Sequence, residues 1–73
     1  MDELTFYLQG MNFSGADLSK LDLRFVNFKY ANMVGVDLSG CNLSHASFER
    51  ADLTDANMDV SYYHCVNLVD GPV

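Results

Sequence analysis

Residues 31–55 read ANMVG VDLSG CNLSH ASFER ADLTD, five units of five residues that follow one another without a gap. The third residue of each unit is large and apolar, and the first is small or apolar. The second is Asp, Asn or Ser, and the last two are mostly polar residues or Gly. An α-helix needs a period near 3.6 residues and a half-buried strand needs strict alternation, so a sustained period of five fits neither.

The same frame extends in both directions, from Phe6 to Asp70, and divides that stretch into thirteen units. Asp or Asn occupies the second position in ten of these thirteen units. Within a unit the first and third residues share one side, as in a very short strand, and the last two residues turn the chain. We therefore predict an all-β coil whose interior holds the first positions together with the third positions, which are Leu8, Phe13, Leu18, Leu23, Phe28, Met33, Leu38, Leu43, Phe48, Leu53, Met58, Tyr63 and Leu68.

Three units carry a resemblance that fixes the number of sides. The segments 16–19 (ADLS), 41–44 (CNLS) and 51–54 (ADLT) resemble the A(D/N)LXX signature of pentapeptide-repeat proteins. The resemblance implies a right-handed quadrilateral β-helix with four units, or twenty residues, in each of about three coils. Residues twenty apart then lie one above the other, which predicts that Phe28 lies over Phe48.

The expected solenoid covers residues 6–70, with an N-terminal lead-in at 1–5 and a C-terminal tail at 71–73. A solenoid exposes strand edges and core side chains at its ends unless a cap covers them. Neither end of this sequence contains a convincing cap. We therefore expect either a piece of a longer protein or end-to-end association with a second copy, for which Tyr62 and Tyr63 are suitable contacts.

Composition restricts the partners. The formal charge is −6 with only four Lys and Arg residues, which argues against direct nucleic-acid binding through phosphates. The apolar runs are far shorter than the ~20 residues that span a bilayer, and no signal peptide follows the acidic start, so we expect a cytoplasmic or nuclear protein without membrane contact. Two cysteines cannot form a disulfide framework, and free thiols are expected.

The carboxylates and serines do not form a catalytic pattern. Four aspartates, Asp17, Asp22, Asp37 and Asp52, occupy the second position and are explained by its turn preference. Acid–base catalysis needs carboxylates held close together in a cleft, which a convex rod does not provide. We expect no enzymatic activity, no catalytic residue and no cofactor.

His45, His64 and Cys65 are candidate metal ligands, because the twenty-residue register brings them near one another. Zinc requires four ligands, or three ligands and a water molecule, in a tetrahedral array. A solvated histidine and a partly exposed thiol explain these residues better, so no metal is predicted.

An outward cluster departs from the repeat. Phe25 and Tyr30 occupy the fifth position, where polar residues or Gly predominate, and the register places them below His45 and Arg50. Exposed aromatic residues beside Arg are typical of protein-interaction hot spots. We predict a protein-binding site formed by Arg24, Phe25, Lys29, Tyr30, His45, Glu49 and Arg50. The alternative is structural: a cation–π pair of Tyr30 with Arg50, and a Phe25 side chain that fills a corner.

Two functional classes remain, together with a bare scaffold that has no dedicated partner. Residues 15–33 resemble the repeat region of animal proteins with a BTB domain of the potassium-channel-tetramerisation type, which implies the substrate-recognition part of a cullin ubiquitin-ligase adaptor. The alternative class is the acidic bacterial pentapeptide-repeat proteins that mimic DNA and bind type II topoisomerases such as gyrase. That second resemblance lies in fold and acidity alone, and Lys29 and Arg50 interrupt the acidity on one side.

Overall fold

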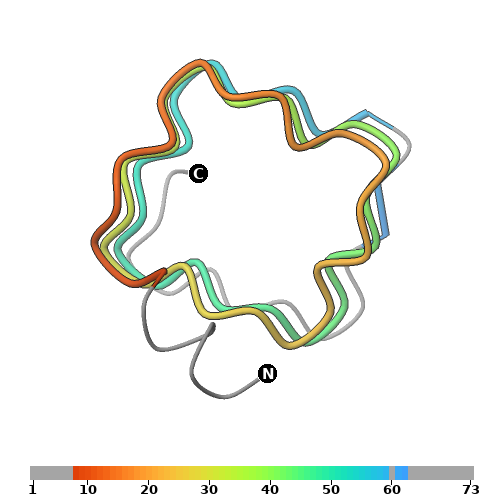
Figure 1. The fold of residues 1–73 in the computed structure, drawn as a ribbon, viewed down its shortest axis with the longest axis horizontal. Helices are drawn as coiled ribbons and strands as arrows, with labels where there is room; N and C mark the ends of the chain where they lie inside the picture. The colour runs from red at the N-terminus through yellow and green to blue at the C-terminus, as the bar shows by residue number, and fades with distance from the viewer. Residues whose placement is uncertain (1–7, 60, 63–73) are drawn as a thin grey trace.

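The computed structural model describes residues 8–59 and 61–62, and it confirms the right-handed quadrilateral β-helix. The chain runs clockwise as it recedes from the viewer, and successive coils lie behind one another (Figure 1). Parallel bridges join residues that are twenty apart in sequence, from Asn12 with Asn32 to Asn42 with Tyr62. Twenty residues therefore complete one coil, and the five-residue unit forms one of its four sides.

The described residues contain no helix and no continuous strand, because each side contributes a single bridging residue. These are the second positions Asn12, Asp17, Asp22, Asn27, Asn32, Asp37, Asn42, Ser47, Asp52, Asn57 and Tyr62. Hydrogen bonds continue beyond each bridge: the N–H of Phe28 donates to the carbonyl of Ser47 at 2.7 Å, and the N–H of Ser47 donates to the carbonyl of Val26 at 2.9 Å. This pattern repeats around the coil and holds neighbouring coils in register.

Each corner is a tight turn that the second residue helps to close. Its side-chain oxygen accepts a hydrogen bond from the N–H two residues later, as Asp37 does from Ser39 at 2.9 Å. The carbonyl of the third residue accepts from the N–H three residues later, as Leu38 does from Cys41 at 3.2 Å. The fifth residue has a positive φ at every corner from Gly10 to Asp55, as position i+2 of a type II turn requires.

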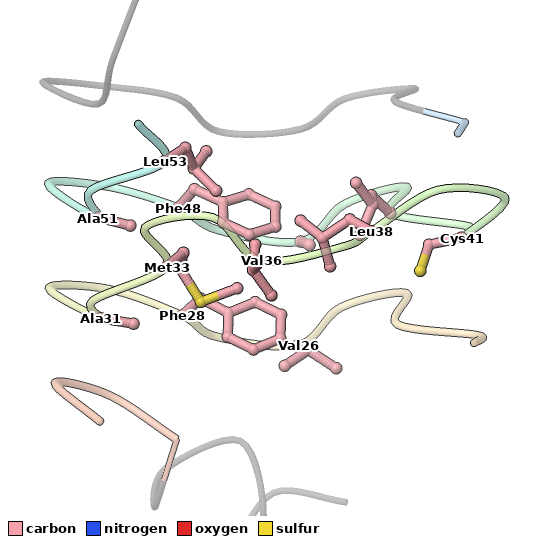
Figure 2. Packing of buried hydrophobic residues seen from close by; sticks show 12 residues of the cluster. Val26, Phe28, Ala31, Met33, Val36, Leu38, Cys41, Phe48, Ala51 and Leu53 are labelled. Carbon is pink, nitrogen blue, oxygen red and sulfur yellow. The ribbon is translucent and has the colours of Figure 1, made fainter. Parts of the chain in front are cut away.

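The core consists of first and third residues, as the sequence predicts. Buried apolar side chains are Val26, Phe28, Ala31, Met33, Val36, Leu38, Cys41, Leu43, Ala46, Phe48, Ala51 and Leu53. Figure 2 shows the Phe28 and Phe48 rings one above the other. Their centroids are 5.1 Å apart and their planes differ by 11°, which confirms the predicted stack.

Burial falls toward the first described coil. Met11 and Leu21 occupy first positions, yet each is 45% exposed, whereas Ala31 and Cys41 in the same columns are buried. The predicted lead-in, the C-terminal tail and Tyr63 lie outside the described residues. No helix in the described part of the chain has the length and apolar character needed to cross a membrane.

Candidate functional site

The outward cluster lies on the side formed by residues 26–30 and 46–50, together with the corner that precedes it. We call this surface the aromatic face and define it by Arg24, Phe25, Lys29, Tyr30, His45, Glu49 and Arg50. Arg24, Phe25 and His45 lie at the corner that precedes this side. Lys29, Tyr30, Glu49 and Arg50 lie on the side itself and at the corner that ends it. The twenty-residue register places equivalent residues of two coils against each other, so its contacts are vertical pairs.

Phe25 and His45 form the first pair, at one corner of the face. Their ring centroids are 4.8 Å apart and their planes differ by 4°, so the two rings are stacked. Phe25 is nevertheless 59% exposed, which shows that it does not fill the corner in the way the structural alternative expected. The stack therefore presents flat aromatic surface to solvent.

Tyr30 and Arg50 form the second pair, at the next corner. The Arg50 guanidinium carbon lies 5.9 Å from the centroid of the Tyr30 ring, within cation–π range. Tyr30 keeps 57% of its surface exposed beneath this contact. Tyr30 therefore makes the cation–π contact and still exposes aromatic surface to solvent.

Lys29 and Glu49 lie between these corners. The Lys29 Nζ is 3.7 Å from the Glu49 Oε1, at the long end of ion-pair distances, and both side chains are partly exposed. An exposed pair of this kind contributes little stability, typically about 0–1 kcal/mol. Its main effect is to place one positive and one negative group between two aromatic corners.

Arg24 is directed toward its own turn. Its Nε donates to the Asp22 Oδ1 at 2.8 Å, and its Nη2 donates to the Asp22 Oδ2 at 2.7 Å. These bonds lower the pKa of the Asp22 carboxyl, and the carboxylate in turn raises the pKa of Arg24. Arg24 is therefore held by an intramolecular partner at the edge of the aromatic face.

The four corner residues of the face share an unfavourable backbone conformation. Phe25, Tyr30, His45 and Arg50 have φ values of 66°, 61°, 62° and 59°. This left-handed region costs an ordinary L-residue about 1–2 kcal/mol, and a bulky residue there is uncommon. Glycine meets the same requirement at four other corners, so large side chains at these corners oppose the local backbone preference.

Ser47 lies between the two corners of the upper coil and breaks the turn pattern. Elsewhere in the described repeats from 12 to 57, an Asp or Asn oxygen in the second position accepts the N–H two residues later. The Ser47 Oγ is buried without a hydrogen-bond partner, although the bridge to Asn27 is intact. A buried polar atom that its own turn does not satisfy therefore lies behind the aromatic face.

Cys41, His64 and Cys65 are the other residues whose side chains could carry out chemistry. Cys41 is buried and its Sγ donates to the carbonyl of Leu18 at 2.9 Å, so it belongs to the core. Among the described residues, no group of three or more His, Cys, Asp or Glu side chains could hold a metal ion. His64 and Cys65, which were weighed as ligands beside His45, lie outside the described residues.

Sequence reasoning identified the members of the aromatic face and their vertical partners. It missed the positive φ at their corners and the unsatisfied hydroxyl of Ser47. The absence of Asp or Asn at position 47 was visible in the sequence and could have indicated the unsatisfied turn at Ser47. The large side chains of Phe25 and Tyr30 gave no sign of a positive φ, because bulky residues rarely adopt it.

Comparison with known proteins agrees with this geometry. The family model "Pentapeptide repeats (8 copies)" matches residues 7–31 and 31–59. The crystal structure of a pentapeptide repeat protein, Rfr23 from the cyanobacterium Cyanothece 51142, is similar, with a TM-score of 0.78 and 29% identity. The match covers 81% of this chain and 40% of the Rfr23 chain, so this chain spans well under half of that protein. A search of the curated proteins found no match.

Proposed function

The chain belongs to the pentapeptide-repeat family, and from that premise we propose that it is a non-enzymatic module that binds a protein partner through its aromatic face. The fold supports a scaffolding role because it presents rigid, regularly spaced side chains on flat sides. The proposed activity is recognition: no bond is made or broken. The contact residues are the members of the aromatic face.

One observation carries this proposal. Phe25 and Tyr30 are more than half exposed at corners whose positive φ disfavours a bulky side chain. The solenoid gains little from such residues, because Gly10, Gly15, Gly35 and Gly40 form the same turn without strain. Strain maintained at an exposed aromatic side chain supports a functional role. Aromatic residues and Arg are also the side chains that contribute most at protein interfaces.

The experiment replaces three corner residues by glycine. The variant Phe25→Gly/Tyr30→Gly/Arg50→Gly removes the aromatic surface and relieves the backbone at the same positions. We expect it to melt no more than a few degrees below the natural chain, since lost cross-coil contacts are offset by relieved strain. We also expect it to lose the proteins that the immobilised natural chain captures from a cell lysate.

The matched control is Lys20→Gly/Asp55→Gly, which changes two corners with the same positive φ outside the aromatic face. Capture should be unchanged in this control. Equal capture by the triple variant and the natural chain would refute the aromatic face as the binding surface.

The finer proposal is that this module recognises substrates for a BTB-type cullin ubiquitin ligase. It is supported by the sequence resemblance of residues 15–33 alone. The same capture experiment tests it, because ligase components should be enriched on the natural chain and absent from the triple variant. The coding sequence on either side of this segment provides an independent test, since a BTB domain should precede it.

A DNA-mimicking role predicts a different surface. Mimicry of duplex phosphates would use the carboxylates on the other sides of the solenoid, such as Asp17, Asp37 and Asp52, and not the aromatic face, where Lys29 pairs with Glu49. A supercoiling assay with gyrase separates the two classes. We expect no inhibition at micromolar concentrations of the chain, and clear inhibition would favour mimicry.

A further inference from the structure

The turn that ends the upper half of the aromatic face lacks one of its usual hydrogen bonds. At nine other described turns, an Asp or Asn oxygen in the second position accepts the N–H two residues later, at 2.9 to 3.2 Å. At Ser47 the hydroxyl oxygen is buried and has no hydrogen-bond partner. No described residue accepts the N–H of Glu49. We call residues 47–51 the Ser47 turn.

The equivalent turn in the coil below is complete. There the Asn27 Oδ1 accepts the N–H of Lys29 at 2.9 Å. Asn27 and Ser47 form a parallel bridge, so the two turns correspond residue by residue. Both also keep the bond from the first residue of the next unit to the third residue, which joins the Ala31 N–H to the Phe28 carbonyl at 3.1 Å and the Ala51 N–H to the Phe48 carbonyl at 2.9 Å. The Ser47 turn is therefore closed by one hydrogen bond fewer than the turn below it.

Backbone strain opposes closure of both turns. Their fifth residues, Tyr30 and Arg50, have φ values of 61° and 59°, in a region that disfavours large side chains. In the lower turn the bond from Lys29 to Asn27 offsets this strain, whereas the upper turn has no such bond. A segment that has fewer hydrogen bonds opens at a lower cost in free energy.

From this difference we infer that the Ser47 turn opens locally while the rest of the solenoid stays folded. Opening breaks the bond from Ala51 to Phe48 and the bond from the Tyr30 N–H to the Glu49 carbonyl, which is 3.0 Å long in the closed turn. Because the Arg50 guanidinium lies over the Tyr30 ring when the turn is closed, opening changes how much of that ring it covers. The Tyr30–Arg50 half of the aromatic face therefore has two conformations.

The core limits this motion to two residues. Phe48 and Ala51 lie on either side of the corner and are only 0% and 3% exposed, so packing holds both ends of the turn. Glu49 and Arg50 lie between them, outside the core. Local opening of this kind takes place within microseconds to seconds, without loss of the fold.

Native-state hydrogen exchange of the ¹⁵N-labelled chain measures the opening at each amide. Ala51 and Ala31 donate the equivalent bonds of the two turns, so their protection factors are compared directly. We expect Ala51 to be less protected than Ala31 by about two- to tenfold, the effect of one neutral hydrogen bond. Ala46 follows a turn that the Asn42 oxygen closes at 3.1 Å, and it should be protected as strongly as Ala31.

Two reciprocal substitutions move the missing bond from one coil to the other. Ser47→Asn supplies the acceptor and should raise the protection of Ala51 by about two- to tenfold, with Ala31 unchanged. Asn27→Ser removes the acceptor below and should lower the protection of Ala31 by a similar factor. Ser47→Ala is the matched control: it removes the hydroxyl without closing the turn, and Ala51 should stay weakly protected.

The Leu38 amide, which donates to the Asn57 carbonyl of the next coil at 2.7 Å, reports the overall stability of each variant. The inference is overturned if Ala51 is protected as strongly as Ala31 in the natural chain. It is also overturned if Ser47→Asn raises the protection of Ala51 no more than that of Leu38, because the change would then be global. Capture of proteins by the triple glycine variant does not enter this test, so the local opening and the binding surface stand or fail separately.

Discussion

At the scale of single residues, the second position of each unit decides how well its corner is closed. An Asp or Asn oxygen there accepts the N–H two residues later at 2.9 to 3.2 Å in nine described repeats. Ser19 and Thr54 add a hydroxyl that donates to the same oxygen at 2.6 Å. The repeat therefore selects Asp and Asn for a local hydrogen bond, which explains much of the acidity without any catalytic role.

Ser47→Asn should stabilise the solenoid. The serine hydroxyl is buried without a partner, whereas an asparagine oxygen can accept the N–H of Glu49, as Asn27 does from Lys29 in the coil below. A net gain of about 0.5–1.5 kcal/mol in the free energy of unfolding is expected, measured by urea titration. Ser47→Ala is the matched control, because it removes the hydroxyl without supplying an acceptor. Asparagine that is no more stable than alanine at this position would contradict the prediction.

Asp17 should make the stability of the fold depend on pH in the acidic range. Hydrogen bonds from the Ser19 hydroxyl and N–H lower its pKa in the folded chain. A carboxyl with a lowered folded pKa stabilises the fold above its unfolded pKa, near 4, and this contribution is lost as the pH falls through the folded value. Carbon-detected NMR titration should show the pKa of Asp17 rising in Ser19→Ala, toward its usual range.

The stability of Ser19→Ala should accordingly change less than that of the natural chain between pH 5 and pH 2, a range chosen to bracket carboxyl titration near pH 4. Asp52, which Thr54 holds in the same way, serves as the internal control, and its pKa should not move in Ser19→Ala. An unchanged Asp17 titration would show that the serine hydroxyl has no influence on the carboxyl.

At the scale of the five-residue element, the corner is the part that the sequence predicted least. The division of each unit into buried first and third residues followed from side-chain size alone, and the structure confirms it from Val26 to Leu53. The positive φ of the fifth residue could not be read from Lys20, Phe25 or Arg50, because none of these residue types favours it. The turn imposes that conformation: the coil-to-coil hydrogen bonds around it outweigh the local preference of the residue.

Gly35 offers a direct measure of this corner strain. A Cβ atom at Gly35 would meet nothing closer than 4.0 Å, so a substitution there is opposed by the backbone at φ +68° and not by a clash. Gly35→Ala should cost about 1 kcal/mol and Gly35→Val more, since a β-branched residue tolerates this region least. Gly35→Asn should cost less than either, because Asn adopts positive φ more readily. The corner assignment would be wrong if the Gly35→Val variant melted at a higher temperature than the Gly35→Asn variant.

Leu43→Asp should unfold the chain. Leu43 is fully buried in a third position, and an aspartate there has neither a cation nor a solvent path. An unpaired buried charge costs several kcal/mol, which is comparable to the whole stability of a domain of this size. Asn42→Asp changes the neighbouring outward residue to a type common at second positions, and it should retain the fold. A cooperative β-type melt for Leu43→Asp would contradict the packing described here.

At the scale of the whole molecule, the register explains why so much of the site was predictable. Once four units were assigned to a coil, the pairs Phe25 with His45 and Tyr30 with Arg50 followed from counting twenty residues, and the ring contacts confirm them. Counting cannot give the tilt of a ring or the exposure of a side chain. Those depend on the turn geometry and on the neighbours at each corner, which is why the exposure of Phe25 required the structure.

Deleting one unit should preserve the fold and break the aromatic face. Removing residues 36–40 shifts every later residue by one side, so that Leu53 instead of Phe48 lies over Phe28. Two buried side chains are lost, each contributing about 1.5–3 kcal/mol. The coil-to-coil hydrogen bonds of this unit are lost as well, such as the one from the Leu38 N–H to the Asn57 carbonyl at 2.7 Å, so we expect the fold to be retained at lower stability.

Circular dichroism should therefore show a β-type spectrum with a lower melting temperature, and nuclear Overhauser contacts between Phe28 and Phe48 should be replaced by contacts between Phe28 and Leu53. Deletion of residues 36–38 alone provides the control, because it breaks the five-residue frame and should prevent folding. An unfolded unit-deletion variant would mean that the four sides are not interchangeable. A folded variant that no longer captures the proteins bound by the natural chain would show that the frame specifies the fold, whereas recognition depends on which residues the twenty-residue coil brings together.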